Sequence, residues 1–143
     1  MTLSAACADA PTDSRQPVTS AAAHTSQAVS TTASVDATAA MQFSSVYQTL
    51  CYCLRNSSDA AVGRYLARDT FNRDAHDKLH ELIRVTQGRN VVVSQRLQDA
   101  KLALEESLGF LFQGRDPTQA FTDLLSALSD AYRVTGIVVP ETC

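Results

Sequence analysis

Apolar side chains recur at every third or fourth position from Met41 onward, which is the spacing of one face of an α-helix. The pattern predicts four helices, over residues 42–56, 60–87, 91–112 and 117–134. Short polar or Gly-containing segments separate these helices, as helix ends require. Because short connections place consecutive helices antiparallel, we expect an all-α fold: an up-and-down bundle of three to four antiparallel helices.

The last predicted helix has the clearest start signal in the chain. Asp116 fits an N-cap, Pro117 the first helical position and Gln119 the third position of a capping box. Gly136 and Pro140 follow that helix, so we expect residues 135–143 to form an extended C-terminal tail. The bundle itself is then predicted to span residues 41–134.

Residues 1–40 differ from the rest of the chain. They are rich in Ala, Thr and Ser, contain no aromatic residue and include only one Leu, Leu3. Such a segment cannot bury enough apolar surface to offset the entropy lost on ordering, so we predict that it is disordered. Its Ser, Thr and Ala content is typical of a mitochondrial transit peptide, whereas a single Arg against three Asp favours a plain tail.

The four cysteines do not form an obvious disulfide framework. They are Cys7, Cys51, Cys53 and Cys143. Cys51 and Cys53 are two residues apart on a predicted helix, so their side chains point to different faces. We therefore expect neither a disulfide nor a zinc site, but reduced, partly buried thiols in an intracellular compartment.

Composition and charge narrow the class of partner. The chain has 143 residues, enough for one domain, and a net charge of −3 that disfavours direct nucleic-acid binding. No apolar run is long enough for a membrane span. Residues 55–101 carry nine Lys or Arg against six acids, whereas residues 102–143 carry two against six. The basic middle is either a solvated face with mixed ion pairs or a docking face for an acidic partner.

Catalytic motifs are missing from the sequence. It has no nucleotide-binding loop, nucleophile elbow or zinc-protease motif. His76 and His80 are four residues apart and share a helical face, which makes them the weak candidates for metal ligands. Because no third ligand with a supporting shell accompanies them, we expect surface histidines, no metal and no catalytic residues. A metal-dependent enzyme is the remaining enzymatic alternative.

Two segments resemble the mitochondrial LYR-motif (complex I LYR) superfamily. Residues 46–55, Val-Tyr-Gln-Thr-Leu-Cys-Tyr-Cys-Leu-Arg, resemble its first helix, which starts with Leu-Tyr-Arg. Residues 64–73 resemble its second element, in which basic residues accompany a Phe. Val46 replaces the motif Leu, a mild change. Gln48 replaces the motif Arg, and a neutral amide cannot form the ion pair of a guanidinium.

Three further segments are similar to one branch, the small assembly factor of the mitochondrial ATP synthase (complex V). They are Leu-His-Glu-Leu at 79–82, Phe-Gln-Gly-Arg at 112–115 and Gly-Ile-Val-Val-Pro at 136–140. The resemblance implies a three-helix LYR-like core with a C-terminal helix added. It also implies a non-enzymatic adaptor in the mitochondrial matrix that helps to assemble a mitochondrial complex, such as ATP synthase.

The resemblance further implies the partners and the binding residues. LYR proteins bind acylated mitochondrial acyl carrier protein, whose acyl-phosphopantetheine is the only cofactor expected, together with a client subunit or chaperone. The residues implied for the carrier-protein face are Arg55, Arg64, Arg68 and Arg73. Those implied for the motif and acyl channel are Val46, Tyr47, Gln48, Leu50, Leu54, Leu66 and Phe71. The alternative is a small structural subunit of a mitochondrial ribosome or respiratory complex.

Overall fold

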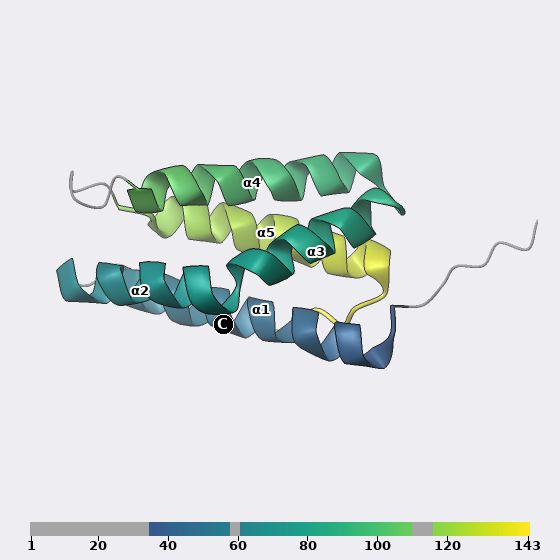
Figure 1. Ribbon diagram of the computed structural model, residues 1–143, viewed down its shortest axis with the longest axis horizontal. Coiled ribbons are helices and arrows are strands. Elements are labelled where there is room, and N and C mark those ends of the chain that lie inside the picture. The colour runs from purple at the N-terminus through teal and green to yellow at the C-terminus, as the bar shows by residue number, and fades with distance from the viewer. Residues whose placement is uncertain (1–34, 58–60, 110–115) are drawn as a thin grey trace, which may run out of the picture. The chain divides into compact units, whose positions relative to one another are not determined.

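The computed structural model describes residues 35–57, 61–109 and 116–143, and these form helices but no strand. The helices are α1 (Ala37–Ser57), α2 (Ala61–Asp74), α3 (His76–Gln87), α4 (Val91–Gly109) and α5 (Thr118–Thr135). Figure 1 shows α1 beside α2 and α4 beside α5, and these pairs make the most extensive helix contacts. The predicted all-α bundle is therefore confirmed.

The short helix α3 joins the two pairs. It packs most closely on α4, and it also contacts α1, α2 and α5. Its buried face consists of Leu79, Leu82 and Thr86. The Ser94 hydroxyl of α4 donates to the Ile83 carbonyl at 2.9 Å, which fixes the α3–α4 contact with a hydrogen bond as well as apolar packing.

The prediction of one helix over residues 60–87 was wrong, because the chain forms α2 and α3 with a break at Ala75. Ala75 has φ −120° and ψ −36°, outside the helical range, although its amide still donates to the Phe71 carbonyl at 3.0 Å. No Pro or Gly lies here, and the apolar spacing continues from Phe71 through Ala75 to Leu79. Tertiary packing sets the break: α2 packs on α1, whereas α3 turns toward α4.

The first helix begins earlier than the predicted residue 42. The Asp36 carboxylate accepts the Thr38 amide at 3.2 Å, and its carbonyl accepts the Ala40 amide at 2.8 Å, so Asp36 caps a helix that starts at Ala37. The predicted boundary at residue 40 therefore falls inside α1. The prediction of disorder for residues 1–34 lies outside the described residues, as does the predicted helix end at residue 112.

The core is formed by all five helices. Its largest fully buried side chains include Leu50, Phe71, Leu79, Leu82, Leu97, Leu104, Phe121, Leu124, Leu128 and Tyr132. Tyr132 of α5 donates its hydroxyl to the Phe43 carbonyl of α1, and burial raises its pKa well above the ordinary value. This buried hydrogen bond ties the end of α5 to the start of α1.

The start of α5 lies one residue later than predicted: Pro117, not Asp116, is at the N-cap position and Thr118 is the first helical residue, although Asp116 still binds the Thr118 amide. The Asp116 carboxylate accepts the Thr118 amide at 2.9 Å and also the Thr118 hydroxyl. These bonds hold the pKa of Asp116 below its usual range. The Gln119 side chain instead donates to Asp123 at 2.8 Å, so the reciprocal bond of a capping box is not made.

We expect Asp116→Ala to lower the free energy of unfolding by about 1 kcal/mol, because the Thr118 amide loses its acceptor. Urea unfolding followed by circular dichroism measures this change. Gln119→Ala is the matched control and leaves the Asp116–Thr118 hydrogen bond in place. An equal loss in both variants would contradict the stabilising role of the Asp116–Thr118 hydrogen bond.

The cysteine prediction was wrong for two residues, because Cys51 and Cys143 form a disulfide with Cα atoms 5.1 Å apart, whereas Cys53 is a free, buried thiol as predicted. The residues are separated by 92 positions, so their proximity depends on how the tail returns to α1. Gly136, with φ 75°, ends α5 in the left-handed conformation that glycine adopts without steric penalty. The Ile137 amide then donates to the Tyr132 carbonyl at 2.9 Å, and this turn directs the tail toward α1.

Candidate docking surface on the first two helices

The outer face of α2 carries a row of apolar side chains. Val62, Tyr65 and Leu66 are 79%, 44% and 44% exposed, and their spacing places them on one side of the helix. The opposite side of α2 buries Ala67 and Phe71 against the core. We call Val62, Tyr65 and Leu66 the α2 stripe. Contiguous exposed apolar groups of this kind are typical of interaction sites.

Two of the predicted arginines lie on one flank of α2, between the α2 stripe and the buried side of the helix. Arg64 and Arg68 are one helical turn apart and half-buried on the flank of α2 next to Tyr65. The pKa of Asp116 is lowered mainly by its hydrogen bonds with Thr118, and the charge of the nearby Arg64 adds to this effect. Arg68 forms no ion pair with a carboxylate in the described part of the chain. Its guanidinium is therefore the least engaged of the four.

The other two predicted arginines do not join this flank. Arg73 is five residues after Arg68, about 140° farther around the helix at 100° per residue, and it pairs with Asp74 at 2.8 Å. That pair holds the pKa of Asp74 below its usual range. Arg55 of α1 donates to the Cys143 carbonyl at 2.7 Å, so it contacts the C-terminal tail. The four arginines therefore do not form one continuous face.

The residues implied for the motif and acyl channel differ in how deeply they are buried. Val46, Leu50 and Phe71 are fully buried. Tyr47 and Leu54 are half-buried, whereas Gln48 and Leu66 are exposed. The buried members pack in the common core with α5. Two surface hollows lie elsewhere, one between α4 and α5 and one over the first turns of α4. None of the seven residues lines either hollow.

The two histidines contact each other, and His76 also contacts two carboxylates. Their rings meet edge-on with centroids 4.8 Å apart. His76 lies 2.9 Å from both Asp77 and Glu105, through its two ring nitrogens. No group of three or more His, Cys, Asp or Glu side chains is placed to hold a metal ion among the residues that the structure describes.

Glu105 also pairs with a residue that the sequence analysis did not single out. Lys101 of α4 is 2% exposed, and its ammonium pairs with Glu105, the carboxylate that His76 also contacts. These contacts therefore link the first residue of α3 to the middle of α4. The spacing of Lys101 and Glu105 by four residues was visible in the sequence, but their burial was not.

Neither the hydropathy of the described helices nor comparison with known proteins supplies a functional assignment. None of the helices in the described ranges is long and apolar enough to cross a membrane. No protein-family model, curated protein or solved structure matches this chain. A functional assignment therefore depends on the surface itself and on the resemblance of residues 46–55 and 64–73 to LYR proteins.

Proposed function

We propose that this chain is a non-enzymatic adaptor that binds an acidic partner protein on the outer face of α2. The observation that carries the proposal is the position of Arg68 one helical turn from Tyr65 of the α2 stripe, with Arg64 next to Arg68 on the same flank of α2. Apolar contacts supply affinity, and the two guanidinium groups supply orientation and attraction to an acidic surface. Arg68 has no carboxylate partner among the described residues, so a partner carboxylate would not displace an existing ion pair.

The partner we propose is acylated mitochondrial acyl carrier protein, in the mitochondrial matrix. That protein is strongly acidic, which complements Arg64 and Arg68, and its acyl chain would meet the apolar side chains of α2. Each methylene that becomes buried contributes about 0.8 kcal/mol. The proposed client is a subunit or chaperone of a mitochondrial complex such as ATP synthase.

The packing of α1 and α2 refines where an acyl chain would lie. Val46, Leu50 and Phe71 are fully buried and already in contact with other core residues. Entry between the helices would have to displace these side chains, whereas Tyr65 and Leu66 are accessible without rearrangement. We therefore place the acyl chain first against the α2 stripe, with Leu66 at the point of entry.

A second candidate function is a stable structural subunit of a larger assembly. Val91, Val92 and Leu102 of α4 are exposed, on a helix remote in sequence from the α2 stripe. A permanent subunit needs such additional apolar surface for its neighbours. The two functions differ in stoichiometry, because an assembly factor leaves the finished complex and a subunit stays.

The test is a pull-down of purified acylated carrier protein by the Arg64→Glu/Arg68→Glu variant. We expect affinity to fall roughly 100-fold or more, because juxtaposed like charges cost several kcal/mol. Intact-mass analysis of the eluate identifies the carrier protein and its acyl load. Circular dichroism of the variant checks that the helices are retained.

The matched control is Arg84→Glu/Arg133→Glu, which makes the same change in net charge on α3 and α5. Both arginines are exposed and paired within their own helices, with Glu81 and Asp130. We expect this control to bind like the unmodified chain. An equal loss of affinity in both variants would mean that net charge alone causes the effect. Absence of binding by the unmodified chain would exclude the carrier protein as the partner.

A further inference from the structure

The tail after α5 lies across the bundle as a strap with two attachment points. It leaves α5 through Gly136 and ends at Cys143, which the disulfide joins to Cys51 of α1. Ile137 is 5% exposed, Val138 is 83% exposed and Val139 is half-buried, the alternation expected of an extended segment lying on a surface. Figure 1 places the C-terminus beside α1. We call residues 137–143 the C-terminal strap.

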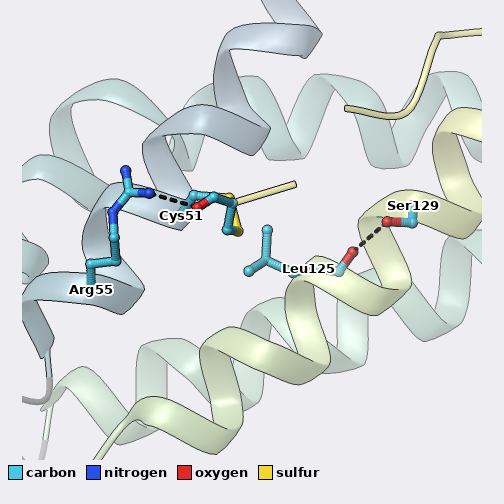
Figure 2. The surroundings of a disulfide bond; sticks show 5 residues. Cys51, Arg55, Leu125 and Ser129 are labelled. Carbon is cyan, nitrogen blue, oxygen red and sulfur yellow. Dashed lines mark hydrogen bonds between the residues drawn. A yellow bond between two sulfur atoms is a disulfide. The ribbon is translucent and has the colours of Figure 1, made fainter. Parts of the chain in front are cut away.

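The disulfide joins a buried residue to an exposed one. Cys51 is fully buried in the core, whereas Cys143 and the two residues before it are exposed. Figure 2 shows Leu125 of α5 directed toward the disulfide, which therefore lies between α1 and α5. The Arg55 guanidinium donates to the Cys143 carbonyl at 2.7 Å and adds a second hold on the end of the strap.

We propose that the Cys51–Cys143 bond is a reversible redox latch for the C-terminal strap. When a dithiol reductant opens it, the strap leaves α1 and α5, and the apolar surface around Cys51 and Leu125 becomes accessible while the helices stay folded. When the bond forms again, the strap covers that surface. This inference goes beyond the proposed docking function and does not depend on it.

Thiol–disulfide exchange can begin at the exposed end of the latch. A thiolate of the reductant attacks the Cys143 sulfur and forms a mixed disulfide, and Cys51 leaves as a thiolate that takes a proton from water. The second thiol of the reductant then attacks the mixed disulfide and releases the Cys143 thiol. Two electrons pass to the protein, and the reductant becomes a disulfide. An oxidised dithiol reverses both steps.

Cys53 does not compete with this exchange. It is two residues after Cys51, about 200° around the helix at 100° per residue, and its thiol donates to the Ala67 carbonyl of α2 at 3.3 Å. Burial raises the pKa of the Cys53 thiol to about 12, so little thiolate is present at neutral pH. Among the cysteines in the described part of the chain, the latch therefore has no internal exchange partner.

The bundle has contacts that hold α1 to α5 without the strap. Tyr132 donates to the Phe43 carbonyl, the Tyr47 and Tyr132 rings lie 6.4 Å apart, and both helices bury side chains in the common core. Opening the strap exposes Ile137 and the half-buried Val139, but it removes no helix from the core. This is why opening is expected to release the strap rather than unfold the protein.

The experiment uses the full chain with Cys7→Ser, so that labelling reports only Cys51, Cys53 and Cys143. Peptide mapping of the oxidised protein is expected to give a Cys51–Cys143 cross-link. Addition of a thioredoxin-type dithiol protein is expected to release two thiols without denaturant. Heteronuclear NOE values of residues 138–143 should then fall, while the amide shifts of α4 stay unchanged.

Two variants separate the latch from a general effect of reductant. Cys143→Ser should show the open state without reductant, and Cys53→Ala should still close and open. The proposal would be overturned by a different pairing of cysteines, by a bond that opens only after denaturation, or by a strap that stays ordered when reduced. Collapse of the whole spectrum on reduction would overturn it as well, because the bond would then be required for folding.

Discussion

Replacing Cys143 with Ser is expected to lower the free energy of unfolding by about 4 kcal/mol. The disulfide joins residues 92 positions apart, so it closes most of the folded chain into one loop and restricts the unfolded state. Chain-entropy arguments give between about 4 and 5 kcal/mol for a loop of this length, and measured values for disulfides are typically about 2–5 kcal/mol. Urea unfolding followed by circular dichroism without reductant measures the change.

The control for this prediction is the Cys53→Ala variant, which keeps the disulfide. Its stability should still fall by about 4 kcal/mol when a dithiol is added, whereas the stability of Cys143→Ser should not respond. A small domain typically has about 5–15 kcal/mol of stability, so the reduced bundle can remain folded. A reductant effect below about 1 kcal/mol in the unmodified chain would contradict the stabilising role of the disulfide.

The fold was largely predictable because helix periodicity is a local property of the sequence. Leu124 and Leu128 of α5, one turn apart, are buried as their spacing predicts. The start of α5 was predicted to within one residue for the same reason, since the Asp116 carboxylate accepts an amide two residues away. Asp36 caps α1 in the same way but was missed, because the Ala-rich sequence around it has no apolar stripe that marks a helix.

The remaining errors concern properties that depend on tertiary structure. The break at Ala75 has no Gly or Pro to mark it, because it arises where α2 leaves α1 and α3 turns to α4. The disulfide was missed because Cys51 and Cys143 come together only through the turn at Gly136 and the path of the strap. No spacing rule connects residues so far apart along the chain.

The placement of the arginines on α2 follows from their spacing, whatever their function. Arg64 and Arg68 lie together because an i, i+4 spacing on a helix guarantees it. Arg73 lies elsewhere, since its distance of five residues from Arg68 rotates it to another side of α2. The exposure of Leu66 could not be read from its apolar character, because the sequence does not show which side of α2 packs on α1.

Glu105→Ala is expected to lower the free energy of unfolding by about 3 kcal/mol, the second large effect. The substitution removes the partner of Lys101, whose side chain is almost fully buried in α4, and it also removes a contact of His76. A buried ammonium without its carboxylate loses both water and its counter-charge, and breaking such pairs typically costs about 3–5 kcal/mol. We expect a loss at the low end of this range because the Glu105 side chain is itself partly exposed. Urea unfolding at neutral pH provides the measurement.

Lys101→Met distinguishes a lost charge pair from lost packing. Met fills a similar volume without a charge, and replacing a buried ion pair with apolar groups is often neutral or stabilising. In the Lys101→Met background, Glu105→Ala should therefore cost much less than it does alone, because no charge is left unpaired. The difference between the two costs is the coupling energy of the pair. Equal costs in both backgrounds would mean that Glu105 stabilises the fold through packing or through its contact with His76. If the contact with His76 is responsible, His76→Ala should reproduce the loss.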